Sequence, residues 1–288
     1  MKWEDHRQSD NVEDRRGSGM GGFGMGGRRI GIGTIVVALL GGWIFGIDPL
    51  TMLSVMSGGG GMIQEQGPAP APPPGDTPAA FVSTVLADTE DVWTSVMQQG
   101  GGAYRAPRLV LFRGAVMTSC GQGSAAMGPF YCPEDQRIYI DLDFFDMLAN
   151  RLGAGGDFAQ AYVIAHEVGH HVQNLLGISG RVNSMRGRLP GKQANALSVR
   201  VELQADCYAG VWTHHSQRSK GWLEQGDIEE ALNAAAQIGD DTLQRRAQGT
   251  TVPESFTHGT GSQRVDWFKR GLQSGDIAQC NTLEASRL

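Results

Sequence analysis

Residues 158–176 read FAQAYVIAHEVGHHVQNLL, with Asp157 directly before them and Gly177 directly after them. Apolar side chains recur at helical spacing through this stretch and surround two polar residues, His166 and His170. Asp157 is typical of a helix N-cap, and Gly177 is typical of a helix end. We therefore predict one helix over 158–176 that carries the pattern His-Glu-x-x-His.

The two outer histidines of this pattern, His166 and His170, are one helical turn apart. Both imidazoles therefore project from the same face and can bind one metal ion. Glu167 follows the first histidine, where it can take a proton from a water molecule on that metal. Burying two histidines for packing alone would be costly, because their polar atoms would lack partners. This spacing predicts a zinc-dependent hydrolytic site with Zn²⁺ as cofactor.

A catalytic zinc ion normally has three protein ligands and one open position. A third histidine in the extended version of the pattern is absent, because Gln173 and Leu176 stand where that version requires glycine and histidine. Downstream, Glu202 and Asp206 are one turn apart on a predicted helix over 194–216. Two carboxylates on a mostly apolar face are costly unless they are paired or bind metal. We predict Glu202 as the third ligand and Asp206 as the acceptor that orients a liganding histidine, with an exposed acidic pair as the alternative.

Residues 257–264, THGTGSQR, form a glycine-rich loop that leads into a predicted helix over 262–273. His258 or Arg264 could donate a hydrogen bond to the oxyanion of a tetrahedral intermediate. The alternative, given equal weight, is that His258 is a surface histidine in the loop before a helix and has no catalytic role. We carry His258 forward as a candidate catalytic residue.

The N-terminal part of the chain is predicted to hold a membrane anchor. Residues 30–47 contain no charge over 18 positions, close to the length that crosses a bilayer. Six basic residues precede this segment, and no Lys or Arg follows it until Arg105. The positive-inside rule then places a polar, glycine-rich tail (1–29) in the cytoplasm and the bulk of the chain outside. We expect a single-pass inner-membrane protein with a periplasmic domain, and a buried glycine-rich hairpin is the alternative.

A glycine- and proline-rich linker at 48–79 would connect this anchor to a domain at 80–288. Within that domain, helical patterns at 77–98, 158–176, 194–216, 227–247 and 262–273 accompany two short strand patterns at 108–113 and 137–142. Strands followed by a run of helices indicate an α+β fold. The net charge of −6 and the absence of a basic cluster exclude a nucleic-acid-binding footprint.

The four cysteines suit an oxidising compartment, where an even count usually means disulfides. Cys120 and Cys132 bracket a Gly/Pro-rich loop, which leaves Cys207 and Cys280 as the second expected pair. Four cysteines allow three pairings, and the sequence does not choose among them.

The chain resembles the glutamate-ligand zincins and, more closely, a bacterial family of neutral zinc metallopeptidases. The resemblance is carried by the opening MKW, the segment at 30–47, AHEVGHH at 165–171, ELQADC at 202–207 and SFTHGT at 255–260. It implies a zincin-like core, membrane attachment, and zinc-dependent hydrolysis of a peptide or protein substrate. In zincins an upstream edge strand pairs with the extended substrate, a role the resemblance would give to Ile138–Ile140.

Two other function classes stay open. One is a catalytically latent zinc-binding scaffold or adaptor of the cell envelope, against which the presence of Glu167 argues. The other is a structural metal module, against which the ligand count argues, since structural zinc sites usually have four protein ligands. The natural substrate and the oligomeric state are not determined by the sequence.

Overall fold

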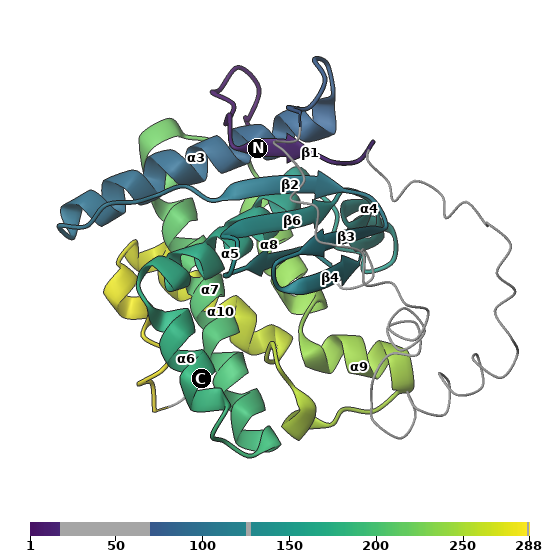
Figure 1. Ribbon diagram of the computed structural model, residues 1–288, viewed down its shortest axis with the longest axis vertical. Coiled ribbons are helices and arrows are strands. Elements are labelled where there is room, and N and C mark those ends of the chain that lie inside the picture. Colours follow the sequence, from purple (N-terminus) through teal and green to yellow (C-terminus); the bar gives the residue numbers. More distant parts are fainter. Residues whose placement is uncertain (18–69, 125–127, 287) are drawn as a thin grey trace, which may run out of the picture. The chain divides into compact units, whose positions relative to one another are not determined.

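A mixed four-stranded sheet, in the order β1-β2-β6-β5, forms the layer on which the helices pack (Figure 1). Its strands are β1 (Val12–Asp14), β2 (Arg108–Phe112), β6 (Arg137–Asp141) and β5 (Phe130–Cys132). β1, β2 and β6 run parallel to one another, whereas β5 runs antiparallel to β6. The computed structural model describes residues 1–17, 70–124, 128–286 and 288, and these belong to one compact unit.

The two faces of the sheet follow from the alternation of side chains along its strands. Leu109 and Leu111 of β2 join the main core, where helices cover the sheet. Val110 and Phe112 point to the opposite face and pack with Val116 in a second, smaller cluster. Val116 belongs to a separate hairpin of β3 (Ala115–Thr118) and β4 (Gly121–Ser124).

Helices make up most of the described chain. They are α3 (Thr77–Gln99), α4 (Asp143–Asn150), α5 (Asp157–Leu175), α6 (Ile178–Arg186), α7 (Gly191–Lys220), α8 (Asp227–Gln237), α9 (Asp240–Gln248) and α10 (Gly261–Ser274), with short 3-10 helices η2 (Pro253–Ser255) and η3 (Ile277–Cys280). The expected combination of a small sheet with many helices is therefore confirmed.

Close backbone contact between α7 and α10 fixes the helical layer near the site. A β-carbon at Gly210 of α7 would collide with the backbone of Phe268, and one at Gly271 of α10 would collide with the backbone of Cys207. Glycine at both positions lets the two helices approach more closely than side chains would allow. This approach brings the buried face of α10 against the part of α7 that carries Asp206.

Two local expectations are corrected. The N-cap of α5 is Gly156, with no side-chain hydrogen bond, and the Asp157 carboxylate instead binds the Met1 ammonium at 2.7 Å. The pattern at 227–247 forms two helices, because the chain breaks at Ile238 and Gly239 between α8 and α9. A β-carbon at Gly239 would collide with the backbone at Gly261, so the break accommodates a close crossing of the two segments.

The prediction of a single-pass membrane anchor is wrong. Residues 30–47 lie outside the described residues, and no helix in the described part of the chain is long and apolar enough to cross a bilayer. β1 precedes the predicted span and β2 follows it, yet the two strands pair in register from Val12–Leu109 onward. Strands hydrogen-bonded in one sheet lie on the same side of any membrane.

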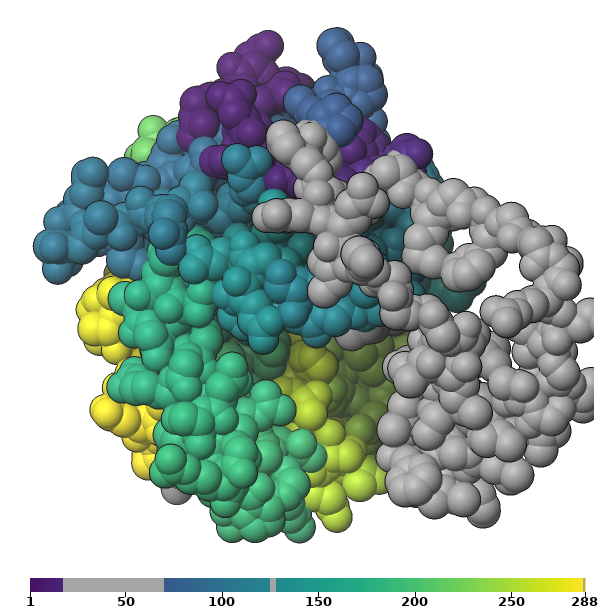
Figure 2. Space-filling model, in the orientation of Figure 1, coloured from purple at the N-terminus to yellow at the C-terminus, as the bar shows by residue number. Residues whose placement is uncertain are grey.

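The assignment of the N-terminal tail and the domain to opposite sides of an inner membrane therefore fails as well. Residues 1–17 are part of the domain: Figure 2 shows them, in purple, packed on the same body as the blue α3. Arg16 links this segment to the start of α3, because it forms ion pairs of 2.6 Å with Asp14 of the segment and with Asp76, the N-cap of α3. Residues 70–79 lie in the same compact unit as the expected domain at 80–288.

Candidate metal centre

His166 and His170 of α5 and Glu202 of α7 meet in one cluster. Their possible ligand atoms all lie within 4.8 Å of one another. Nε2 of His166 is 3.2 Å from one oxygen of Glu202, and Nε2 of His170 is 3.5 Å from the other. The structure thus brings together the three predicted ligands from positions up to 36 residues apart.

The spacing of these atoms fits a tetrahedral zinc ion. Zn–N and Zn–O bonds of about 2.0–2.1 Å imply ligand atoms roughly 3.3 Å apart, close to both distances from Glu202. The side chains of His166, His170 and Glu202 keep 8%, 17% and 19% of their surface exposed, so the cluster is reachable from solvent. Three nitrogen and oxygen donors with solvent access match a catalytic zinc site, which keeps one position open.

Close packing of α5 on α7 creates this geometry. Gly169 lies between the two histidines, and a β-carbon there would be 3.0 Å from the backbone oxygen of Ala205 and 3.1 Å from its Cα. The small residues therefore let the helix axes approach at the level of the cluster. Because Glu202 is three positions before Ala205 on α7, this contact directs its carboxylate toward the histidines.

Each liganding histidine has a partner on its far nitrogen. Nδ1 of His166 is 2.8 Å from Oδ1 of Asp206, and Nδ1 of His170 is 2.9 Å from Oε1 of Gln173. An acceptor at Nδ1 places the proton there and leaves the lone pair of Nε2 for a metal. The predicted contact of Asp206 with a liganding histidine is present. The contact of Gln173 was not predicted, because the sequence showed Gln173 only as the residue that stands where the three-histidine motif requires glycine.

Arg264 lies behind His166, and its position corrects the idea that it contacts substrate. Its side chain is buried with 3% exposed and donates to both oxygens of Asp206 at 2.9 Å. It also donates to the hydroxyl of Tyr162, whose own proton goes to Asp206 at 2.5 Å. These groups hold the carboxylate on the side of His166 that faces away from Glu202.

The charges of the cluster reinforce one another. Burial would raise the pKa of Asp206, but the charges of Arg264 and His166 outweigh it and bring that pKa to about 2. Burial would lower the pKa of His166, but Asp206 and Glu202 raise it to about 10. The pKa of Glu202 falls well below its ordinary value, since His170 and His166 outweigh the opposing effect of burial. Glu202 is therefore an ionised carboxylate facing Nε2 of both histidines, and a metal ion would compete with a proton for these nitrogens.

Glu167 sits next to these ligands and is itself buried, with 6% exposed. Burial raises its pKa above the ordinary carboxyl value, against the opposing charges of His170 and His166. A carboxyl group held in this way is suited to exchange a proton with a neighbouring group.

His258 lies outside the three-residue cluster, on an exposed loop. Its side chain is 52% exposed, and its Nδ1 is 3.2 Å from Oδ1 of Asp240. The other oxygen of Asp240 accepts from the backbone N–H groups of Thr257, His258 and Gly259. The hydrogen bond with Asp240 raises the pKa of His258, with a further contribution from the charge of Glu202. Asp240, at the start of α9, is a residue that the sequence argument missed, because its partner loop is 17 residues away.

His171 takes no part in the cluster. Its Nε2 contacts the backbone oxygen of Arg105 at 2.6 Å, and its Nδ1 is 3.0 Å from the hydroxyl of Tyr131. Burial lowers the pKa of His171 to about 4, so it is a neutral side chain that links α5 to the sheet.

The edge of the sheet differs from the prediction. β6, which contains Ile138–Ile140, has β2 on one side and β5 on the other, so it is not an edge strand. The edge beside α5 is β5, which has no second partner among the described residues. Tyr131 of β5 contacts His171 and Asn174 of α5, so this edge runs beside the helix that carries His166 and His170.

Both expected disulfides are present. Cys120 pairs with Cys132, and Cys207 pairs with Cys280, with no free cysteine remaining. Disulfides persist mainly in oxidising compartments.

A second group of carboxylates, Asp157, Asp227 and Glu230, also has metal-like spacing. Two of these residues already neutralise the Met1 ammonium, at 2.7 Å for Asp157 and 3.4 Å for Asp227. This group thus serves to fasten the N-terminal segment to the domain.

Comparison with known proteins agrees with the geometry. A family model described as "Putative neutral zinc metallopeptidase" matches residues 1–283. The chain is 50% identical over 292 residues to "Uncharacterized protein YpfJ" of Escherichia coli K12, covering 99% of this chain and 100% of that protein. It is 48% identical over 196 residues to "Uncharacterized protein Mb2605" of Mycobacterium bovis, covering 64% of this chain and 65% of that protein. No solved structure matches the chain.

Proposed function

Because the chain belongs to the neutral zinc metallopeptidase family, we propose that it is a zinc-dependent endopeptidase with its active site at His166, His170 and Glu202. The observation that carries this proposal is the spacing of 3.2 Å and 3.5 Å between Glu202 and the two Nε2 atoms. When bound there, zinc would supply Lewis acidity, polarising a peptide carbonyl and acidifying a water molecule at its open position.

The protein's own residues would move the protons. Glu167 accepts a proton from the attacking water and then donates it to the leaving amine. Asp206 and Gln173 keep the two histidines oriented while this happens. Arg264 acts through Asp206, as a positioning residue that keeps the carboxylate ionised and in place.

His258 is the proposed donor to the oxyanion. Asp240 holds its Nδ1, so its Nε2 is the atom left to reach a substrate carbonyl. The same contact raises the pKa of His258, which favours a positively charged donor. A donor of this kind contributes about 3–4 kcal/mol to transition-state stabilisation in well-studied cases.

The substrate would lie along β5. An extended peptide can pair with the open edge of a sheet through its backbone, a mode that accepts many sequences. Tyr131 connects this edge to α5 through its contact with His171, next to the ligand His170. We therefore propose unfolded or extended segments of proteins as the substrate class.

The test is cleavage of an unfolded protein mixture by the full chain, compared with Glu167→Gln. The full chain is needed because residues 1–17 supply β1. Turnover should fall by about 10²–10⁴-fold in the variant, while zinc content, measured in parallel, stays the same. No cleavage by either zinc-loaded protein would refute the peptidase proposal and favour a latent zinc-binding scaffold.

A further inference from the structure

We infer that two buried amides, Gln173 and Gln204, form a relay that makes the orientation of His170 depend on the disulfide Cys207–Cys280. The inference rests on the proposed function, in which His170 is a zinc ligand. It assigns a positioning role to two glutamines and to a disulfide that lie outside the metal cluster.

The relay is a continuous line of hydrogen bonds. Nδ1 of His170 is 2.9 Å from Oε1 of Gln173. Nε2 of Gln173 donates to Oε1 of Gln204 at 3.1 Å and to the backbone oxygen of Val201 at 2.7 Å. Nε2 of Gln204 donates to the backbone oxygen of Cys280 at 2.9 Å. Both glutamines are buried, with 1% and 4% exposed, so water does not compete for these bonds.

Two backbone acceptors, the oxygens of Cys280 and Val201, determine the direction of the relay. The backbone carbonyl of Cys280 can only accept, so the amide nitrogen of Gln204 must face it. The oxygen of Gln204 then faces Gln173 and requires a donor there. This turns the oxygen of Gln173 toward His170, which must carry its proton on Nδ1. Nε2 of His170 is thereby left to face Glu202 and a metal ion.

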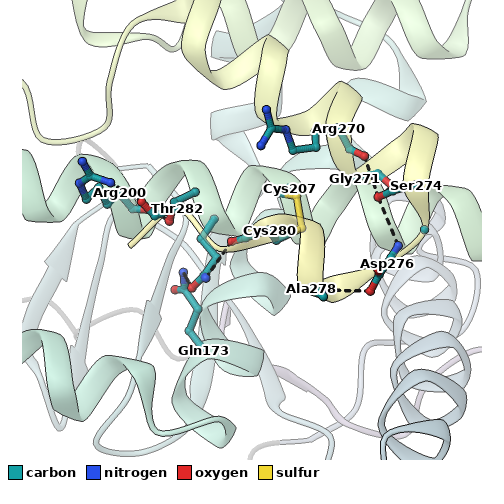
Figure 3. Close-up of a disulfide and its surroundings, with 12 residues drawn as sticks. Gln173, Arg200, Cys207, Arg270, Gly271, Ser274, Asp276, Ala278, Cys280 and Thr282 are labelled. Atoms are coloured by element: carbon teal, nitrogen blue, oxygen red, sulfur yellow. Dashed lines mark hydrogen bonds between the residues drawn. A yellow bond between two sulfur atoms is a disulfide. The ribbon is translucent and has the colours of Figure 1, made fainter. Parts of the chain in front are cut away.

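The disulfide holds that terminal carbonyl in place. Cys207 is three positions after Gln204, so both side chains lie on one side of α7. The covalent bond to Cys207 keeps Cys280 against that side, and Figure 3 shows Gln173 close to the bridge. Thr282 adds a second tie, because its hydroxyl donates to the backbone oxygen of Arg200 at 2.5 Å.

His170 depends on this arrangement more than His166 does. The acceptor of His166 is a carboxylate fixed by two charge-assisted bonds from Arg264. The acceptor of His170 is a neutral amide that is held by two neutral hydrogen bonds, to the backbone oxygen of Val201 and to Gln204, and the disulfide supports the second of these. Cutting the disulfide should therefore loosen His170 and leave the Asp206 side intact. Loss of such a supporting contact typically lowers metal affinity by about 10–100-fold.

The experiment compares the full chain with Gln204→Met and with a variant in which Cys207 and Cys280 are both alanine. The matched control replaces the other bridge, Cys120 and Cys132, by alanine. One readout is hydrogen exchange at Nδ1 of His170, followed by ¹⁵N NMR in the metal-free protein. The other is the zinc dissociation constant from competition with a chelator.

We expect the Nδ1 proton to exchange at least about ten-fold faster in both relay variants and at the native rate in the control. Zinc affinity should fall by about 10–100-fold in the same two variants. Gln173→Glu removes the amide donor that links His170 to Gln204, so removing the bridge should have no further effect on His170 in that background. Two variants test the same link, so failure of one to fold leaves the inference testable.

Unchanged exchange and unchanged zinc affinity in Gln204→Met would overturn the relay. A loss on removing the bridge in the Gln173→Glu background that is as large as in the native one would overturn it too, because the bridge would then act by another route. If the full chain bound no zinc but the Nδ1 proton responded as expected, the relay would stand and the proposed metal site would fail.

Discussion

Replacing Arg264 by methionine separates two roles for this residue, since the sequence alone suggested contact with substrate and the structure buries it behind His166. Asp206 is fully buried, and the substitution would remove two charge-assisted hydrogen bonds to it. Each such bond contributes about 1.5–3 kcal/mol, and breaking a buried ion pair from one side costs about 3–5 kcal/mol in total. We therefore expect Arg264→Met to lower the free energy of unfolding by about 3–5 kcal/mol.

The assay is denaturant and thermal unfolding of the metal-free protein with its disulfides intact, so that altered zinc affinity does not contribute. For a domain of this size the loss corresponds to a fall in Tm of roughly 10 °C. The matched variant combines Arg264→Met with Asp206→Asn, which removes the stranded charge but keeps an acceptor for His166. This pair should recover about 2 kcal/mol or more relative to Arg264→Met alone. If Arg264→Met had unchanged stability but lost turnover, the reasoning would be refuted and Arg264 would be assigned a contact with the substrate.

Three further outcomes are expected. Asp240→Asn should lower the pKa of His258, so the alkaline limb of the kcat/KM profile should move to lower pH; an unmoved limb would exclude the His258–Asp240 pair as the donor. Arg16 lowers the pKa of Asp14 and Asp76, so this pairing stabilises the N-terminal segment above the ordinary carboxyl pKa near 3.9 and is lost as pH falls through the lower folded values. The protection of the β1 amides from hydrogen exchange, relative to an unstructured peptide at the same pH, should therefore fall below about pH 4 while that of α5 is kept. Zinc at about 100 times its Kd should add about 2.7 kcal/mol of stability, visible as a higher Tm that a chelator reverses, and an unchanged Tm would count against the site.

Much of the metal centre could be predicted from the sequence because its signals are local. The spacing of His166 and His170 places two imidazoles on one helical face whatever the rest of the chain does. The same periodicity on the next long helix put Glu202 and Asp206 on one face. The free-energy cost of burying two carboxylates indicated that they are paired with cations or bind a metal ion. The strands at 108–112 and 137–141 were found for similar reasons. The pair Cys207–Cys280, 73 positions apart, was expected only as the two cysteines left over.

The errors concern contacts between distant parts of the chain. Hydropathy at 30–47 is a property of that segment alone, whereas the pairing of β1 with β2 joins positions nearly a hundred residues apart and excludes a single crossing between them. Arg264 looked accessible because it follows a glycine-rich loop, but the close approach of α10 to α7 buries it against Asp206. The resemblance gave Ile138–Ile140 an edge role, and nothing in the sequence showed that β5 would add beside it.

The sequence by itself determined which residues could bind a metal ion, because ligand chemistry and the 3.6-residue period of a helix are encoded within single turns. Only the tertiary structure decided how those residues are held. The orientation of each imidazole depends on a partner from elsewhere in the fold: Asp206 backed by Arg264 for His166, and Gln173 backed by Gln204 and Cys280 for His170. Such contacts form only when helices pack closely and exclude water, and no local pattern specifies which helix will supply them.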